Sequence, residues 1–343
     1  MAMFSCGAAA AAADNAFSSS VLQAMRRYSG QSNAPRLWIV GSTECGKKKQ
    51  RSLLEAATYA AVLRSRESMK SDALFHDPYA ACMATQDLVD TENNVNLARK
   101  YHGLSYEIRT KFIDNIVMEL LENNEVRQIV MLTDGMDTRP YRLTWPSGTA
   151  MFDVSPGQVY NIARERFKAA GARVPKGCFL QHVSAVLTNG AHLEDEGWTE
   201  KLESLGYRGD RPSIWLMQGL EGLSFEGLQR LLGYASGLAM KGSMFAGEVA
   251  FNALGANFKE EAEESLTRLF LSNGFRVQTV HHEDMSKDTD EMRTTMDLGV
   301  LASSLWSLFV AQQQKLSEQQ LAIISREIQL AEEAGNEEGF EDG

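Results

Sequence analysis

The chain has 343 residues, of which 44% are hydrophobic, and a formal net charge of -11. This acidic balance disfavours nonspecific binding to nucleic acids or anionic lipids, and no apolar run reaches the roughly 18 residues that a membrane-spanning helix needs. The four cysteines, Cys6, Cys45, Cys82 and Cys178, are far apart and form no CxxC pair, which disfavours a disulfide scaffold or a zinc site and favours a reducing compartment.

The first 51 residues differ in composition from the rest of the chain. They begin with Met-Ala, contain an alanine tract at 8–13 and three serines at 18–20, and carry seven basic residues against two acidic ones. A segment rich in serine, alanine and basic residues and poor in acidic ones is typical of an organelle transit peptide. We therefore expect residues 1–51 to be a disordered transit peptide, for a chloroplast rather than a mitochondrion; a plain disordered N-terminus is the alternative.

Residues 52–124 show helical periodicity. Leucines and alanines recur at three- and four-residue spacing in the first part of this segment, and Arg64 continues the same stripe, as expected for an amphipathic helix. Asp77-Pro78 interrupts the pattern, because proline disfavours helical geometry in the residue before it. A second helix is predicted from about residue 106 to residue 123.

The segment Val126–Pro146, VRQIVMLTDGMDTRPYRLTWP, is central to the organisation of the chain. Its apolar run at 129–132 is too short for a buried helix and has the length of a buried parallel strand. The run ends in the turn Thr133-Asp134-Gly135. Ligands of open α/β sheets bind at the carboxyl ends of strands, and a glycine lets the backbone approach a ligand closely. The turn is therefore a candidate cofactor site, or otherwise an ordinary loop between a strand and a helix.

Strands and helices alternate along the rest of the chain, which indicates an α/β fold with a parallel sheet and helices on both faces. Gly274 is predicted to cap the C-terminus of a helix. An acidic, disordered tail is predicted over 335–343. Strands are predicted at 128–132, 150–154, 178–184, 213–217, 243–248 and 275–280, and helices at 156–170, 225–240, 259–272 and 305–333.

The string Leu132–Leu143, LTDGMDTRPYRL, resembles the LGAGMDTRxYRL signature of the leucine carboxyl methyltransferase-like family. Thr58–Ala80, which ends in LFHDPYA, resembles the N-terminal block of that family, and His102–Asp114 resembles the next block. The resemblance covers roughly residues 53–280, about two thirds of the chain.

The resemblance implies an α/β fold of the class I methyltransferase (Rossmann-like) type. Its centre would be a mostly parallel seven-stranded sheet with an antiparallel final hairpin. The domain would span 52–334, with an N-terminal helical cap at 52–124 and an α/β core with a C-terminal helix at 125–334.

The family uses the cofactor S-adenosylmethionine (SAM), whose carboxylate, ammonium and ribose hydroxyls each need a polar partner. The resemblance places Arg66 and Arg109 where the family binds the cofactor carboxylate; without it, each would be interpreted as a solvated arginine on a helix surface. Asp137 is expected to cap the turn or helix that follows, and Arg139 is expected to pair with a neighbouring carboxylate.

Several of the implied cofactor-binding positions depart from the pattern of the family. Thr133 stands in place of the first turn glycine, Ser155 in place of an aspartate, and Gln218 in place of a glutamate, while Val186 replaces an aspartate after the third strand. Asp153 lies two residues before Ser155, so both side chains point to the same face of the strand, and Asp153 could accept hydrogen bonds from ribose hydroxyls. The cofactor-binding set implied by the resemblance is Arg66, Arg109, Thr133, Gly135, Asp153, Ser155 and Gln218.

The resemblance implies a SAM-dependent O-methyltransferase that acts on a carboxylate or hydroxyl of a protein C-terminus or a small molecule. The altered polar positions leave open a second hypothesis, in which a catalytically inactive protein keeps the fold as a binding or scaffold component of the organelle. Neither a catalytic residue nor an oligomeric state is predicted. The run His281-His282-Glu283-Asp284 is interpreted as a solvated loop, because four adjacent residues cannot all face one metal ion.

Overall fold

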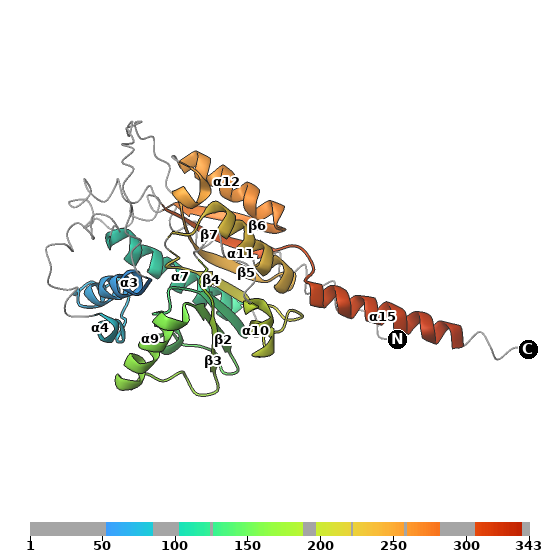
Figure 1. The fold of residues 1–343 in the computed structure, drawn as a ribbon, viewed down its shortest axis with the longest axis horizontal. Helices are drawn as coiled ribbons and strands as arrows, with labels where there is room; N and C mark the ends of the chain where they lie inside the picture. Colours follow the sequence, from blue (N-terminus) through green and yellow to red (C-terminus); the bar gives the residue numbers. More distant parts are fainter. Residues whose placement is uncertain are drawn as a thin grey trace, which may run out of the picture.

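The computed structural model describes residues 53–84, 103–123, 126–187, 197–220, 222–256, 259–281 and 306–337 (Figure 1). The predicted transit peptide at 1–51, residues 338–343 of the predicted tail and the run His282-Glu283-Asp284 lie outside the described residues. The predictions for these segments stay predictions.

A seven-stranded sheet forms the centre of the structure, in the strand order β3-β2-β1-β4-β5-β7-β6. Strands β1 to β5 pair in parallel with their neighbours, whereas β7 runs antiparallel to both β5 and β6. The predicted mostly parallel sheet with an antiparallel final hairpin is confirmed. The strands are β1 (Gln128–Leu132), β2 (Ala150–Ser155), β3 (Phe179–Ser184), β4 (Ile214–Met217), β5 (Met244–Ala250), β6 (Phe275–His281) and β7 (Trp306–Gln313).

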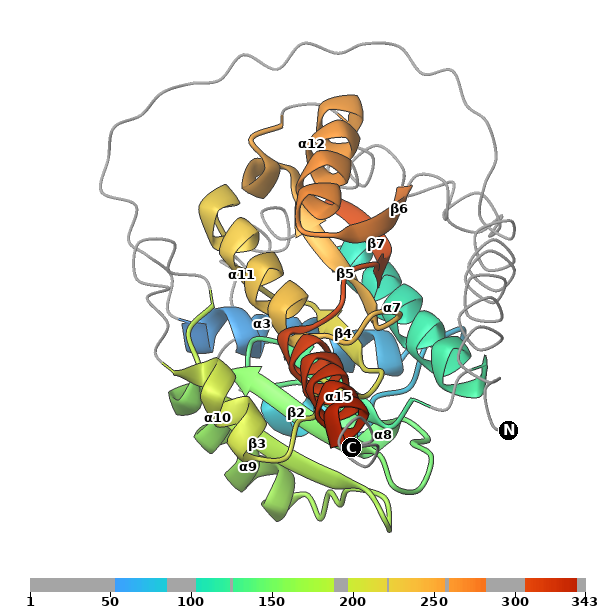
Figure 2. The ribbon, with the colours of Figure 1, turned by 90° about the vertical axis from the view of Figure 1, so that its right-hand side faces the viewer.

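Helices cover both faces of the sheet (Figure 2). Ile129 and Met131 of β1 pack with the apolar face of α7 (Gly103–Asn123). Val130 and Leu132 belong to the core on the opposite face, which includes side chains of α10 (Trp198–Ser204), α11 (Phe225–Leu238) and α12 (Lys259–Ser272). Because both faces of β1 are buried, its sequence is a continuous apolar run rather than an alternating one.

The described part of the predicted cap consists of α3 (Leu53–Ser68), α4 (Ala80–Met83) and α7. Ala57 and Ala61 of α3 pack against Val159 and Ala163 of α9 (Gly157–Ala169), so the cap rests on the helix that follows β2. The short elements that were not predicted include α8 (Arg139–Arg142), α10 and the 3₁₀ helix η2 (Phe251–Leu254).

The helix predicted over 305–333 is wrong in its first part. Residues 306–313 form β7, and the helix α15 begins at Glu318 and continues to Glu337, which includes the start of the predicted tail. In β7, Leu308 and Val310 belong to the core on one face of the sheet and Phe309 to the core on the other. A strand buried on both faces shows no alternation, so its pattern does not distinguish it from a buried helix.

The predicted cap at the end of α12 is confirmed. Gly274 has a φ of 84°, and its N–H donates to the Leu271 carbonyl at 3.0 Å. A Cβ at this position would lie 2.5 Å from the side chain of Lys315. Glycine is therefore needed here both for its left-handed backbone and for the space beside it.

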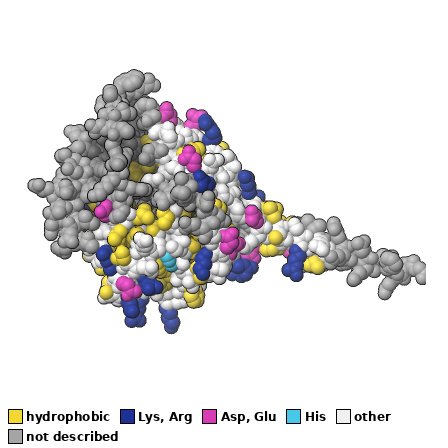
Figure 3. Space-filling model, viewed as in Figure 1, with side chains coloured by type: hydrophobic (Ala, Val, Ile, Leu, Met, Phe, Trp, Pro, Cys, Tyr) yellow, Lys and Arg dark blue, Asp and Glu magenta, His cyan; other side chains and the backbone are white. Residues whose placement is uncertain are grey.

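Helix α15 projects from the body of the molecule (Figure 1). Its first turn is attached through Gln319, whose Oε1 accepts from Gly209 N at 2.7 Å, and through Gln320, whose Oε1 accepts from Lys241 N at 3.0 Å. Hydrophobic and charged side chains lie together on its surface (Figure 3). The exposed apolar residues of this helix include Leu321, Ile323, Ile324 and Leu330.

Gly247 of β5 has no room for a side chain, because a Cβ there would lie 2.4 Å from the Met217 carbonyl oxygen of β4. We expect Gly247→Ala to lower the free energy of unfolding by about 1–3 kcal/mol, measured by urea denaturation. The matched control is Gly233→Ala in α11, where a Cβ would meet only Asn273 at 3.8 Å. The control should raise stability by about 0.5–1 kcal/mol. Similar effects of the two substitutions would contradict this close approach of β4 and β5.

Candidate functional site

Polar side chains converge where β1, β2, β4 and β5 end, the edge at which open α/β sheets bind ligands. Strand β1 ends in the predicted turn Thr133-Asp134-Gly135, and Gly135 has a φ of 95°. A Cβ on Gly135 would lie 3.1 Å from Tyr160 N and from Val159 Cβ. Glycine is therefore required here by the close packing of the turn against the start of α9.

Thr133 is accommodated within this turn. Its Oγ1 accepts a hydrogen bond from Gly135 N at 3.3 Å and donates one to Asp153 Oδ1 at 3.5 Å. The side chain is 2% exposed. The larger residue at this position is thus accommodated between the turn and β2.

The end of β2 presents a carboxyl group and a hydroxyl group from Asp153 and Ser155. Both residues are buried, and Ser155 Oγ has no hydrogen-bond partner among the described residues. Burial, together with the nearby carboxylates of Asp137 and Asp134, raises the pKa of Asp153 to about 7, against the lowering effect of the neighbouring Ser155 and Thr133 hydroxyls. These two side chains therefore retain hydrogen-bonding capacity that the protein itself does not use.

Arg109 is held at the end of β5. Its Nε donates to Glu248 Oε2 at 2.6 Å, and the side chains of both residues are almost completely buried. The guanidinium carbon lies 4.2 Å from the centroid of the Trp306 ring, which is a cation–π distance. Arg109 is thus not the solvated surface residue that its helical position alone suggested.

Gln218 has both ends of its amide group engaged. Its Nε2 donates to Thr110 Oγ1 at 3.0 Å and to Glu248 Oε2 at 3.3 Å, and its Oε1 accepts from Arg139. Glu248 also accepts from the backbone N–H of Gly219 at 3.2 Å. The amide at the end of β4 is therefore part of an internal network.

Arg64, which the sequence did not predict for the site, contacts the turn after β1. The Nη2 atom of Arg64 donates to the Met136 carbonyl at 2.8 Å, its Nη1 to Tyr106 Oη at 2.8 Å, and its Nε to Asp77 Oδ2 at 3.2 Å. Arg66 lies two residues further along α3 and is half-buried. Two residues correspond to about 200° around a helix, so the two arginines leave α3 in nearly opposite directions.

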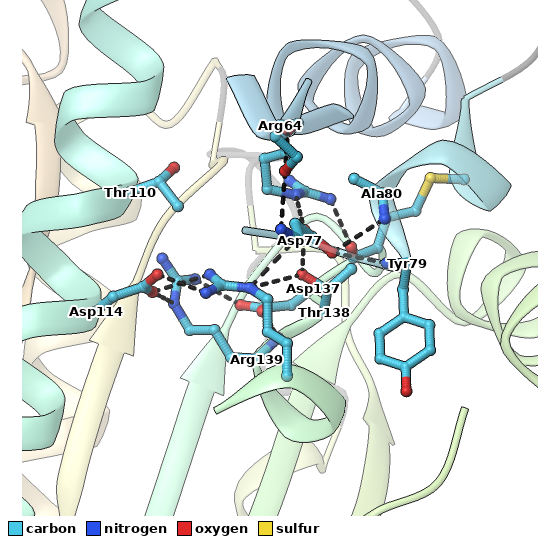
Figure 4. A network of polar contacts seen from close by, with 12 residues as sticks. Arg64, Asp77, Tyr79, Ala80, Thr110, Asp114, Asp137, Thr138 and Arg139 are labelled. Atoms are coloured by element: carbon cyan, nitrogen blue, oxygen red, sulfur yellow. Dashed lines mark hydrogen bonds and ion pairs between the residues drawn. The ribbon is translucent and has the colours of Figure 1, made fainter. Parts of the chain in front are cut away.

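A network of buried charges centres on Arg139 (Figure 4). Its Nε bonds to Asp114 Oδ1 at 2.7 Å and its Nη1 to Asp137 Oδ2 at 2.7 Å, and its backbone N–H donates to Asp137 Oδ1 at 2.8 Å. The prediction that Asp137 caps the turn and that Arg139 pairs with a carboxylate is confirmed. Burial opposes the charge of Asp137, but the Arg139 guanidinium holds the pKa of this carboxyl below its usual range.

The same network continues into the cap (Figure 4). Arg142 bonds to both oxygens of Asp114, at 2.6 and 3.0 Å, and its Nε donates to Thr138 Oγ1 at 3.0 Å. Thr138 donates in turn to Asp77 Oδ2 at 2.6 Å, which is the oxygen that also accepts from Arg64. One chain of contacts therefore links α7, the loop before α4, α3 and the turn after β1.

A small pocket opens beside this edge, next to Arg109. Its described lining is apolar except for Glu248, and the Trp306 ring forms one wall. The lining residues are Leu220, Gly222, Leu223, Glu248, Val249, Ala250, Ala253 and Trp306. The pocket lies next to the buried ion pair of Arg109 and Glu248.

The predicted site residues fall into two groups. Thr133, Gly135, Asp153 and Ser155 meet where β1 and β2 end, and Arg109 and Gln218 meet through Glu248. Val186 follows β3 and is half-buried. Sequence reasoning missed the roles of Arg64, Asp134 and Glu248; the position of Arg64 on the apolar stripe of α3 was the one available signal.

Metal and membrane features are absent from the described residues. No group of three or more His, Cys, Asp and Glu side chains there is arranged to hold a metal ion. No helix in the described ranges is long and apolar enough to cross a membrane.

Comparisons with known proteins agree with the family resemblance. A family model for leucine carboxyl methyltransferase matches residues 57–225. O-methyltransferase 1, chloroplastic, of Oryza sativa subsp. japonica is 35% identical over 309 residues, which cover 88% of this chain and 82% of that protein. A protein of Parafrankia sp. (strain EAN1pec) assigned to the SAM-dependent methyltransferases is 32% identical and covers 60% of this chain and 66% of its own length. A solved DUF574 family protein from Streptomyces avermitilis MA-4680 has 12% identity and a TM-score of 0.41, covering 74% of this chain and 97% of that chain.

Arg139→Gln tests the buried charge network. The substitution leaves the buried Asp137 without its ion-pair partner, whereas Asp114 keeps Arg142, and breaking a buried pair in this way costs about 3–5 kcal/mol. We expect a loss of that size in the free energy of unfolding measured in urea. The control is Arg268→Gln, whose ion pair with Glu264 is exposed and should matter little. Equal losses in the two variants would contradict the proposed contribution of the buried network to the free energy of unfolding.

Asp153→Asn tests the perturbed carboxyl group. Because folding raises the pKa of Asp153 from 3.8 to about 7, the folded protein holds a proton that the unfolded chain releases between these values. The stability that Asp153 contributes is therefore complete below about pH 4 and falls as the pH rises to about 7. We expect the variant to gain stability relative to wild type over this range, by about 1.4 kcal/mol per unit of pKa shift at most. A difference in unfolding free energy that does not change with pH would exclude the raised pKa.

Proposed function

Because the chain belongs to the leucine carboxyl methyltransferase family of SAM-dependent methyltransferases, we propose that it transfers the methyl group of SAM to an oxygen atom of an acceptor molecule. The observation that carries the choice of oxygen is the match to the rice protein named O-methyltransferase, which extends over most of both chains. The acceptor oxygen belongs to a hydroxyl or a carboxylate group.

The residues at the sheet edge fit the polar groups of SAM. Asp153 and the unpartnered Ser155 hydroxyl can receive the ribose hydroxyls at the end of β2. Arg64 and Arg109 bring two guanidinium groups from the cap, suited to a carboxylate. We assign the first of these cations to Arg64 rather than Arg66, because Arg64 contacts the backbone of the β1 turn.

When bound, SAM supplies a methyl group activated by a sulfonium centre. The protein has to orient the acceptor and exclude water, which are the main requirements of such a displacement. A carboxylate acceptor is already ionised at neutral pH, whereas a hydroxyl acceptor also has to lose its proton in the displacement.

The second candidate is a catalytically inactive scaffold with the same fold. The observation that favours it is the internal pairing of the site: Arg109 is bonded to Glu248, and Gln218 is bonded to Arg139. A protein that has lost its cofactor would be expected to satisfy its former binding residues internally in this way. Direct measurement of SAM binding separates the two candidates.

The proposed location is the chloroplast. It is supported by the composition of residues 1–51 and by the name of the rice relative. A mitochondrial location is the alternative. Import of the chain and removal of its N-terminal segment by isolated chloroplasts, but not by isolated mitochondria, would distinguish the two.

Titration calorimetry with SAM tests the proposed function. We expect binding in the micromolar range, weakened about 10- to 100-fold by Arg109→Gln, because a charge-assisted hydrogen bond to the cofactor carboxylate is lost. Arg66→Gln is the matched control on the neighbouring helix and should leave the affinity unchanged. Thermal unfolding of each variant confirms that it is folded. Absence of heat at millimolar SAM with the wild-type chain would favour the scaffold.

A further inference from the structure

Asp134 is a charged residue in the β1 turn that no sequence argument assigned to the site. Its Oδ1 accepts from Met136 N at 2.8 Å, which closes the turn. For Oδ2, no hydrogen-bond donor is found among the described residues. The side chain is half-buried, so this oxygen is available to a ligand that enters at the edge of the sheet.

The carboxylate of Asp134 lies between the turns that follow β1 and β4. A Cβ built on Gly219 would lie 3.1 Å from Asp134 Oδ2, and Gly219 has a φ of 78°. Gly219 therefore leaves room for the carboxylate between the two turns, where a larger residue would push it away.

A cation and an anion are held side by side through one residue of this turn. Met136 accepts from Arg64 through its carbonyl, at 2.8 Å, and donates to Asp134 through its N–H, at 2.8 Å. The pairing places a guanidinium group and a carboxylate on the same short piece of backbone. Such a pair is complementary to a zwitterion that carries a carboxylate and an ammonium on one carbon.

The other acidic and amide groups near Gly219 are already engaged. Gln218 accepts from Arg139 and donates to Thr110 and Glu248, so its carbonyl oxygen has a cationic partner already. Glu248 accepts from Arg109, Gln218 and the Gly219 backbone. Among the described acidic side chains next to Gly219, Asp134 has an oxygen to which no donor is assigned.

We propose that Asp134 binds the α-ammonium group of the methionine moiety of SAM. The inference rests on the proposed function, because it requires that SAM be the ligand. Under this inference, the negative charge that meets the ammonium group comes from the turn after β1.

The test uses Asp134→Asn in the full chain and two probes, S-adenosylhomocysteine and 5′-methylthioadenosine. The second probe lacks the carboxylate and ammonium groups of the first. Asparagine keeps an oxygen that accepts from Met136 N and removes the charge, so the turn should remain folded. We expect calorimetry to show a 10- to 100-fold loss of affinity for S-adenosylhomocysteine and less than about a twofold change for 5′-methylthioadenosine.

Two further variants control the interpretation. Asp134→Ser also keeps an acceptor for the turn without the charge, and it replaces Asp134→Asn if that variant fails to fold. Asp210→Asn removes one negative charge before β4, where Asp210 pairs with Arg208, and should change neither affinity. These controls separate a contact with the ammonium from a general effect of net charge.

The outcomes are distinguishable. Equal losses for both probes would show that Asp134 acts only through the fold of the turn and would overturn the inference. Tighter binding of S-adenosylhomocysteine by Asp134→Asn would show that the carboxylate obstructs the crevice, which also overturns it. Binding of 5′-methylthioadenosine but not S-adenosylhomocysteine to the wild-type chain would refute the inference alone. If the wild-type chain bound neither probe, both the proposed function and the inference would fail.

Discussion

The guanidinium group of Arg139 is the contact on which the arrangement of this sheet edge depends. It bonds to Asp114 of the cap, to Asp137 of its own turn and to Gln218 at the end of β4. Burial opposes the charge, yet Asp137 and Asp114 keep the pKa of Arg139 above its ordinary value. Desolvating such charges costs several kcal/mol each, so the network acts chiefly by fixing one relative position of three segments.

This constraint explains how the site can differ from its family pattern and still present suitable chemistry. The Gln218 side chain accepts a hydrogen bond from Arg139 and donates one to Glu248, so the end of β4 is part of the internal charge network. The polar groups that remain for a ligand lie one or two strands away, in Asp153, Ser155 and Asp134. The backbone of Met136 holds Asp134 next to Arg64, so the cap and the β1 turn together supply a cation and an anion.

Sequence periodicity identified the elements well wherever only one face of an element was buried or where the run was short. The helices α9, α11 and α12 and the first six strands appear within a few residues of their predicted bounds. Strand β7 was taken for the start of a helix, because Leu308 and Phe309 enter opposite cores and leave no alternation to detect. The antiparallel hairpin was predicted from the family resemblance, whereas the periodic pattern alone predicted a helix in this segment.

The amino-acid sequence by itself determined the fold class, the family and the position of the turn after β1, because these depend on local patterns: the apolar run 129–132, its glycine and the retained Asp137-Thr138-Arg139 string. Only the tertiary structure decided which side chains face that turn. Arg64 contacts it, because the packing of α3 directs this residue of the helix toward the turn. Likewise, the occupation of Gln218 and the open oxygen of Asp134 depend on Arg139, Glu248 and Gly219, residues distant in sequence that meet only when the parallel strands end at one edge of the sheet.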